Sequence, residues 1–314
     1  MNIAFFGTPR FGVPTLQHLL DCPHTIAGVV TQPDRPRGRG QKVTFAPVKA
    51  LAVEHDIPVF QPDRLKPPEV ADRLRAWNAD VAVVAAYGRI IPGHLLTIPR
   101  LGMINVHASL LPKYRGAAPV HRAVMNGDVE TGVTIMRLVQ ELDAGPMFAK
   151  VTRAIGPDDT SDLVEEALAG LGATLLLTVL DQMAAGTARE DPQDDSQATY
   201  APRLTKEEGL IDWSQSAATI HNRVRGLYPW PHAYTFLNGA RLIVRRSRVT
   251  ANPEGPRHSR PGTITTATHE MIRVATADGE LDITEVQPEG RRPMSVRDFA
   301  AGHRLAPGDV FSQS

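Results

Sequence analysis

One short stretch of the sequence places polar side chains at a spacing that could do chemistry. Residues 103–109 read Met-Ile-Asn-Val-His-Ala-Ser, an apolar strand pattern that contains Asn105 and His107. Because side chains alternate across a strand, these two residues point to the same side. A histidine can take or relay a proton near neutral pH, and an asparagine amide can donate to a developing oxyanion. The alternative is a polar strand end whose side chains are satisfied within the fold.

Asp143 is the third candidate and lies in the turn Gln-Glu-Leu-Asp-Ala-Gly-Pro at residues 140–146. Aspartate before Ala-Gly often makes only a local turn, which is the alternative interpretation. Together with Asn105 and His107, its carboxylate could fix the imidazole tautomer or hold a water. The sequence has no Gly-x-Ser-x-Gly nucleophile motif. Such a set without a nucleophile predicts direct acyl transfer between two bound substrates.

Two other kinds of chemistry are disfavoured by the sequence. The segment Gly7–Gly12 follows the first predicted strand but lacks the second glycine of a dinucleotide fingerprint. The single cysteine, Cys22, excludes an internal disulfide and a multi-cysteine metal cluster. The histidines at positions 18, 55, 94 and 121 lack metal-ligand spacing. We therefore expect neither a nicotinamide cofactor nor a metal.

The elements that must position these residues lie in the first half, where apolar β-rich runs alternate with helical patterns. Val81–Ala85 is apolar at every position, as in strands that are covered on both faces. This predicts a doubly wound, Rossmann-like α/β domain with a mostly parallel sheet, whose ligands bind at the carboxyl ends of the strands. The predicted strands are Asn2–Phe6, Thr25–Thr31, Val81–Ala85, Gly102–His107, Gly132–Leu138 and Met147–Arg153. The predicted helices are Val13–Leu20, Pro47–His55, Pro67–Trp77, Ala118–Asn126 and Ser161–Ala184.

The second half of the chain has a different pattern. We predict a catalytic domain at residues 1–189, an aperiodic polar linker at residues 190–206 and a second domain at residues 207–314. One helix is expected at Ser214–Leu227. Asn238-Gly239 and Asp278-Gly279 each separate two apolar runs, which is a strong hairpin signal. Several short strands at this spacing predict a small OB-like β-barrel.

Composition limits the class of protein. The chain has 314 residues, of which 34 are Lys or Arg and 34 are Asp or Glu, so its formal net charge is zero. No apolar run approaches the ~18 residues of a membrane helix, and no export signal is visible. The cytosol is therefore the expected compartment, and we expect no membrane partner.

The charge is unevenly distributed along the chain. Arg241–Arg260 holds six arginines and one acid, and Asp34–Lys49 holds five cations and one acid. The neutral total therefore excludes a uniformly cationic nucleic-acid binder, but it is compatible with two local basic patches.

Residues 105–119, Asn-Val-His-Ala-Ser-Leu-Leu-Pro-Lys-Tyr-Arg-Gly-Ala-Ala-Pro, resemble the signature of the folate-dependent formyltransferases. The likeness continues through most of the chain. It includes Phe6–Pro9, Thr31–Gly40, Thr131–Met136, Leu142–Gly145, Leu204–Glu208, Ile211–Trp213 and Pro229–Pro231. The basic loop and the second domain narrow the resemblance to the members that act on methionyl-tRNA. Arg10, where the family usually has an acid, and Thr250–Arg260 depart from the pattern.

The resemblance implies transfer of a formyl group from 10-formyltetrahydrofolate to the amino group of methionyl-initiator tRNA. It assigns oxyanion stabilisation to Asn105 and to His107, which also manages protons. Asp143 would orient His107 or a water that carries the proton to the leaving nitrogen. Which of His107 and Asp143 moves the proton is left open.

The same resemblance implies the binding residues for both substrates. The folate-binding residues are Ser109, Leu110, Leu111, Pro112, Arg89, Ile90 and Ile91. The tRNA-binding residues are Arg35, Arg37, Arg39 and Lys42 in the basic loop and Arg245, Arg246 and Arg248 in the second domain. Arg39 is the candidate for reading the unpaired end of the initiator. Contacts to phosphates are independent of sequence and sensitive to salt.

Two alternatives remain open at this stage. The chain could be a formyltransferase for an amino-sugar nucleotide or a glycinamide ribonucleotide, although the glycinamide enzymes need no second domain. It could also be a non-catalytic RNA-binding protein, which predicts nothing special at Asn105, His107 and Asp143.

Overall fold

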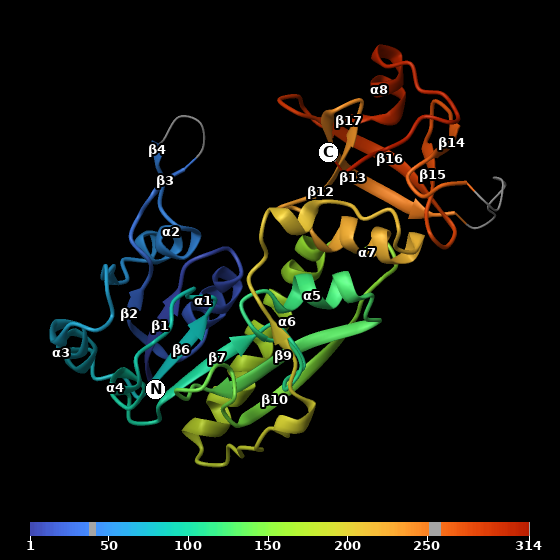
Figure 1. The fold of residues 1–314 in the computed structure, drawn as a ribbon. Coiled ribbons are helices and arrows are strands. Elements are labelled where there is room, and N and C mark those ends of the chain that lie inside the picture. Colours follow the sequence, from blue (N-terminus) through green and yellow to red (C-terminus); the bar gives the residue numbers. More distant parts are fainter. Residues whose placement is uncertain (38–41, 251–258, 314) are drawn as a thin grey trace. The chain divides into compact units, whose positions relative to one another are not determined.

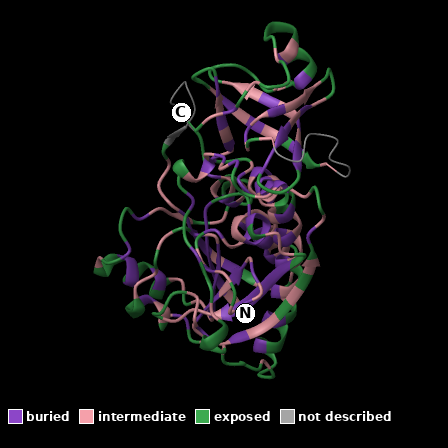
Figure 2. Ribbon diagram, turned by 45° about the vertical axis from the view of Figure 1, so that its right-hand side comes forward, coloured by how far each residue is buried: buried purple, intermediate pink, exposed green. Residues whose placement is uncertain are grey.

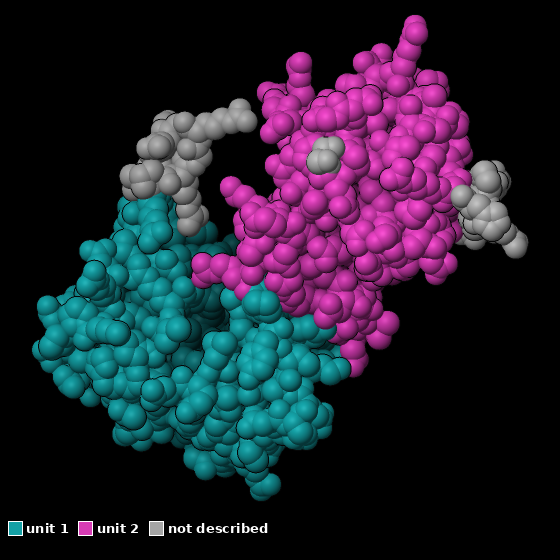
Figure 3. All heavy atoms as spheres, viewed as in Figure 1, with its two compact units in different colours: residues 1–119, 131–153, 165–202 teal, residues 120–130, 154–164, 203–314 magenta. Residues whose placement is uncertain are grey.

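The computed structural model describes residues 1–37, 42–250 and 259–313 (Figure 1). Residue contacts divide the chain into two compact units (Figure 3). Unit 1 comprises residues 1–119, 131–153 and 165–202, and unit 2 comprises residues 120–130, 154–164 and 203–314. Three segments of the chain therefore contribute to each unit.

Unit 1 is built on a seven-stranded sheet in the order β10-β9-β7-β6-β1-β2-β5. The central strands pair in parallel, and β9 runs antiparallel to β7. The sheet consists of β1 (Asn2–Gly7), β2 (Thr25–Val30), β5 (Val59–Phe60), β6 (Val81–Ala85), β7 (Met103–His107), β9 (Glu130–Arg137) and β10 (Met147–Ala154). All five residues of β6 are buried, as expected for a strand covered on both faces. Figure 2 shows buried residues, in purple, gathered in the strands of the sheet. The predicted mostly parallel α/β sheet is confirmed.

Five of the helices begin and end close to the predicted positions, and the one-turn helix Gly93–Leu96 was not predicted. They are α1 (Gly12–Leu20), α2 (Pro47–Glu54), α3 (Pro68–Ala76), α4 (Gly93–Leu96), α5 (Pro119–Asn126) and α6 (Ser161–Ala184). By length and composition alone, α6 is apolar enough to cross a membrane. Its buried face includes Leu168, Leu176 and Val179, and Gly172 lies against Val106 of β7. These contacts are those of a core helix that packs on a sheet.

Unit 2 contains an antiparallel sheet in the order β12-β13-β16-β15-β14, with β17 paired to β16. Its elements are α7 (Ala217–Gly226), β12 (Ala233–Leu237), β13 (Ala240–Val249), β14 (Ile264–Ala267), β15 (Ile272–Ala275), β16 (Glu280–Pro288), β17 (Met294–Ser295) and α8 (Val296–Gly302). Both predicted hairpins are confirmed. Asn238 and Gly239 have φ values of +50° and +75°, the left-handed conformation that this tight turn requires.

The C-terminal segment bridges both edges of this sheet. Ser312 pairs with Phe236 of β12, and Val310 pairs with Thr263 just before β14. Between them, Phe311 is 2% exposed and stacks on Trp213 with ring centroids 5.6 Å apart. One segment bonded to both edge strands is what closes an open sheet into a barrel and protects its edges.

The polar segment before unit 2 is packed on unit 1. It carries a short 3-10 helix, Asp195–Gln197, and β11 (Tyr200–Ala201), which pairs in parallel with β8 (Arg115–Gly116). The pairing of β11 with β8 places residues 193–201 beside the segment that follows β7.

The basic loop begins and ends in the two-residue strands β3 (Pro36–Arg37) and β4 (Lys42–Val43).

Candidate active site

His107 is the last residue of β7 and is 5% exposed. Its Nε2 lies 3.0 Å from the carbonyl oxygen of Tyr114. Because a carbonyl oxygen can only accept, Nε2 carries the proton, and Nδ1 keeps a free lone pair in the neutral ring. Nδ1 faces Oδ2 of Asp143 at 3.8 Å. A proton taken up at Nδ1 would therefore form an ion pair with this carboxylate.

Asp143 lies in the turn after β9, with its side chain 12% exposed. Its backbone is in the left-handed region, at φ +48°. Its Oδ2 accepts a hydrogen bond of 2.8 Å from the backbone N–H of Gly116. Gly116 has φ +121°, and a Cβ there would lie 2.8 Å from the carbonyl oxygen of Ala201. Only glycine fits this position without displacing the donor to Asp143.

Asn105 lies two residues before His107 on the same strand and on the same side. It pairs with Val84 of β6 and Met136 of β9, so its backbone is fixed from both sides. Among the residues that the structure describes, its amide has no side-chain hydrogen-bond partner. The amide donor is therefore available to a ligand at the carboxyl end of β7.

The predicted folate-binding turn Ser109–Pro112 is held by the strands beneath it. The Ser109 hydroxyl is buried and donates to the carbonyl oxygen of Lys113 at 2.6 Å. The Thr134 hydroxyl on β9 donates to the Ser109 carbonyl oxygen and accepts from the N–H of Leu111. Leu111 is 1% exposed, whereas Leu110 and Pro112 are half-buried. A ligand therefore meets Leu110, Pro112 and the backbone of this turn, but not the Ser109 hydroxyl.

The second predicted folate segment follows β6. Arg89 donates from Nη1 to the carbonyl oxygens of Pro62 and Asp63, at 3.0 and 2.7 Å. Ile91 packs on the core, while Ile90 is 85% exposed. Arg89 thus joins the ends of β6 and β5, and Ile90 is free to cover an apolar ligand.

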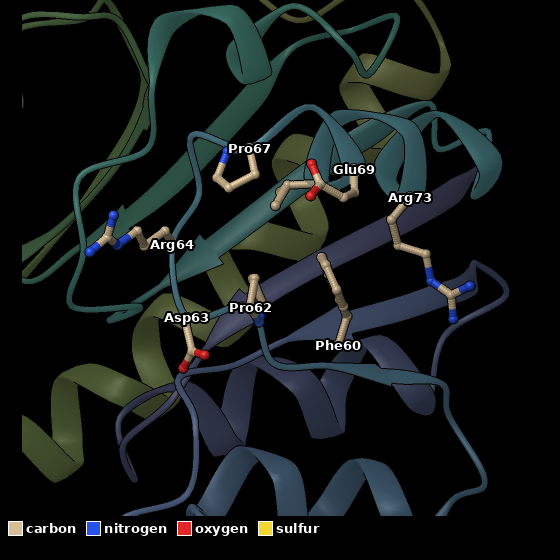
Figure 4. A pocket seen from close by; sticks show the side chains of 8 residues that line it. Phe60, Pro62, Asp63, Arg64, Pro67, Glu69 and Arg73 are labelled. Atoms are coloured by element: carbon tan, nitrogen blue, oxygen red, sulfur yellow. The ribbon is translucent and has the colours of Figure 1, made fainter.

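A cavity of about 520 Å³ opens beside the loop that Arg89 holds (Figure 4). Its floor is apolar and includes Phe60 and Val70, and Arg64 and Arg73 are among its charged lining residues. Asp63 and Glu69 also line it. The cavity therefore combines an apolar floor with two cationic and two anionic side chains, which suits a ligand with an apolar body and polar groups.

The basic loop is anchored at its base. Asp34 forms an ion pair with Lys49 of α2 and accepts a hydrogen bond from Gln61 at 3.2 Å. The hydrogen bond from Lys49 lowers the pKa of Asp34 below its usual value. Arg35 is exposed. The side chains of Arg37 and Lys42, and all of Arg39, lie outside the described residues.

The three predicted tRNA-binding arginines of β13 have different surroundings. Arg245 is 17% exposed and donates to Nε2 of His232 at 2.8 Å, with its guanidinium 5.0 Å from the Tyr228 ring. Arg246 is 71% exposed and pairs with Glu285 at 3.2 Å, and Arg248 is exposed. Arg246 and Arg248 are thus accessible to phosphate, whereas Arg245 is engaged within unit 2.

The structure places Asp143 against His107, with Asn105 two residues earlier on the same strand, and it adds partners that the sequence did not reveal. Tyr114 and Gly116 lie inside the quoted signature, but their roles depend on the backbone and give no side-chain signal. Gln193 lies in the predicted linker and contacts the Asp143 turn. In the described part of the chain, no group of three or more His, Cys, Asp or Glu could hold a metal.

Known proteins resemble the chain over its whole length. Residues 1–180 match the family model described as formyl transferase, and residues 203–304 match the formyl transferase C-terminal domain. The chain is 48% identical over 307 residues to a methionyl-tRNA formyltransferase of Methylococcus capsulatus, covering 98% of each protein. It is 49% identical over 310 residues to that of Trichlorobacter lovleyi, covering 99% of this chain and 96% of the relative.

Two solved structures share the fold. WlaRD, a sugar 3N-formyl transferase, superposes with a TM-score of 0.67 at 17% identity, over 93% of this chain and 99% of that one. Glycinamide ribonucleotide transformylase 1 of Symbiobacterium toebii gives a TM-score of 0.51 at 20% identity, over 62% of this chain and 94% of that one. At these identities the likeness shows the fold alone.

Proposed function

Because the chain belongs to the formyltransferase family, we propose that it transfers the formyl group of 10-formyltetrahydrofolate to the amino group of methionyl-initiator tRNA. The observation that carries the choice of acceptor is the full-length similarity to methionyl-tRNA formyltransferases, at 48% and 49% identity. The product is N-formylmethionyl-tRNA, which serves translation initiation. Every proposed site residue lies in one chain, so the site needs no second copy, and we propose that the protein acts as a monomer in the bacterial cytosol.

The reaction needs one bond to form, one to break and one proton to move. The α-amino group has a pKa near 8, so a usable fraction is neutral and nucleophilic near pH 7. Its attack on the formyl carbon creates an oxyanion. The C–N bond to the folate then breaks, and the proton that the amine loses ends on the folate nitrogen.

The site residues divide this work between them. The free amide of Asn105 donates to the oxyanion. Nδ1 of His107, which keeps its lone pair, takes the proton from the attacking amine, and the resulting imidazolium is offset by Asp143 at 3.8 Å. The imidazolium then supplies the proton to the leaving nitrogen, directly or through a water that Asp143 holds. Because Nε2 is bonded to Tyr114, the ring keeps its orientation throughout.

Folate binding is proposed along two turns at the carboxyl edge of the sheet. Ser109–Pro112 and Arg89–Ile91 offer backbone groups and apolar side chains to a flat ring, and Ile90 is positioned to cover it. The cavity beside Arg89 contains Arg64 and Arg73, which match the carboxylates at the other end of the co-substrate.

tRNA binding is proposed at two basic patches. The loop with Arg35, Arg37, Arg39 and Lys42 would approach the acceptor end, with Arg39 as the reader of the unpaired end. In unit 2, the accessible Arg246 and Arg248 would contact phosphates. Arg245 would act indirectly, by holding the hairpin through His232.

The test is formyl transfer from 10-formyltetrahydrofolate to methionyl-initiator tRNA, with methionyl-elongator tRNA as the control. We expect rapid formylation of the initiator and much slower formylation of the elongator. An amino-sugar nucleotide provides a third arm, because the fold is shared with sugar formyltransferases. Formylation of the sugar but not of the tRNA would overturn the proposal.

A further inference from the structure

Gln193 touches the turn that carries Asp143, although it follows it by fifty residues in the sequence. Its amide nitrogen donates to the carbonyl oxygens of Asp143 and Gly145, at 2.8 and 2.7 Å. Its amide oxygen accepts from Nε and Nη2 of Arg115, at 3.1 and 2.8 Å. Both ends of this one side chain are therefore fully engaged.

Arg115 fixes the orientation of the Gln193 side chain. The Arg115 side chain is 5% exposed, and its Nη2 also binds Asp195 at 2.6 Å. The backbone N–H of Arg115 donates to the carbonyl oxygen of Thr199 in the same segment. A buried guanidinium in a defined position therefore orients the amide of Gln193, which then presents its two N–H groups to the Asp143 turn.

The backbone of the Asp143 turn needs hydrogen bonds from outside the turn to keep its conformation. Asp143 is at φ +48°, a conformation that residues with a side chain adopt rarely. At Gly145 a Cβ would lie 1.9 Å from the carbonyl oxygen of Arg137, so the turn is pressed against β9. Gln193 binds the carbonyls on both sides of Ala144. It thereby fixes the part of the turn from which the Asp143 carboxylate projects.

The same segment also supports the partner of His107. The Thr199 hydroxyl accepts from the backbone N–H of Tyr114 at 2.9 Å, and the Tyr114 carbonyl holds Nε2 of His107. Residues 193–199 thus hold both sides of the His107–Asp143 pair. We infer that Gln193 is a positioning residue for formyl transfer, which sets the Asp143 carboxylate against Nδ1 of His107. This inference rests on the proposed function.

The test separates two contacts of Gln193. One is the pair of hydrogen bonds that its amide nitrogen donates to the Asp143 turn, and the other is the contact of its amide oxygen with Arg115. Gln193→Glu keeps an oxygen for Arg115 but removes both N–H groups. Gln193→Met removes all the hydrogen bonds at similar size. Gln197→Glu is the matched control, because it makes the same change in the same segment on an exposed side chain that binds Asp194 instead. For each variant we would measure kcat, KM for tRNA, KM for the folate and the midpoint of thermal unfolding.

We expect both Gln193 variants to lower kcat by about 10- to 100-fold, because a misplacement of about 1 Å can cost that much. KM for tRNA should change by less than about threefold, and the thermal unfolding midpoints should show that both variants are folded at the assay temperature. A merely structural role predicts instead that Gln193→Glu restores kcat, which would overturn the inference. A rise in KM alone would also overturn it. If the wild-type protein formylates no tRNA, the proposed function fails, which is a separate outcome.

Discussion

At the residue scale, the chemistry of His107 depends on which ring nitrogen is free. The Tyr114 carbonyl fixes the proton on Nε2, so Nδ1 is the basic atom, and the carboxylate of Asp143 lies against it. Asn105 lies on the same strand face, and its amide donates to none of the residues that the structure describes. A proton acceptor and an oxyanion donor are thus held by one strand, whose backbone is paired on both sides.

Replacing either group should reduce turnover strongly. We expect Asn105→Ala and His107→Ala each to lower kcat by about 10²–10³, the cost of losing one oxyanion donor or the proton carrier. His94→Ala, on an exposed side chain of α4, is the control and should leave kcat unchanged. Single-turnover formylation of methionyl-initiator tRNA measures the effect. Near-normal turnover in both variants would contradict the proposed roles.

The sequence could predict the pairing of Asn105 with His107, because strand alternation is a local rule. It could name Asp143 as a candidate but could not place its carboxylate against His107, because that approach depends on a turn after a different strand. Gln193 gives no local signal. Its partners, Arg115 and the Asp143 turn, are brought to it only by the packing of residues 190–202 on unit 1.

At the element scale, two glycines of α6 show how closely this helix packs on the central sheet. A Cβ at Gly172 would lie 2.7 Å from Cγ1 of Val106, whereas a Cβ at Gly170 would meet nothing within 4 Å. We expect Gly170→Ala to stabilise the protein by about 1 kcal/mol through helix propensity. Gly172→Ala should destabilise it by about 1–3 kcal/mol through overpacking. Denaturant unfolding of the full chain measures both, and equal effects would refute close packing at Gly172.

The β12–β13 hairpin should lose stability in mild acid. Burial, with Arg245 and Arg241 nearby, lowers the pKa of His232 to about 4, against 6.5 for a free histidine. Below pH 6.5, His232 is protonated in the unfolded chain but stays neutral in the folded protein. The free energy of unfolding therefore falls as the pH drops from about 6.5 to about 4. His232→Gln can still accept from Arg245 but cannot titrate. Its thermal unfolding midpoint should fall less over this range, and parallel curves for both proteins would contradict the assignment.

The longer elements could be predicted from periodicity and burial pattern. Val81–Ala85 and Ser161–Ala184 coincide with β6 and α6, and both hairpin turns are where Asn-Gly and Asp-Gly occur. The short elements could not be predicted. The two-residue strands β8 and β11 have no period, and they exist only because distant backbone segments meet. The closing of the second sheet by Val310 and Ser312 depends on tertiary contacts in the same way.

At the scale of the whole molecule, the zero net charge means that any attraction to tRNA must come from local patches. Binding through placed phosphate contacts releases counterions, so affinity for tRNA should fall linearly with salt on a logarithmic plot. Arg248→Gln, at an exposed position of β13, should reduce the slope of that plot by about one contact. Arg75→Gln is the control, because Arg75 is exposed on α3 of unit 1, pairs with Asp72 on the same helix and belongs to neither proposed patch. Filter binding across a salt series measures both, and a flat response for the wild-type protein would exclude a phosphate-binding role for the unit 2 arginines.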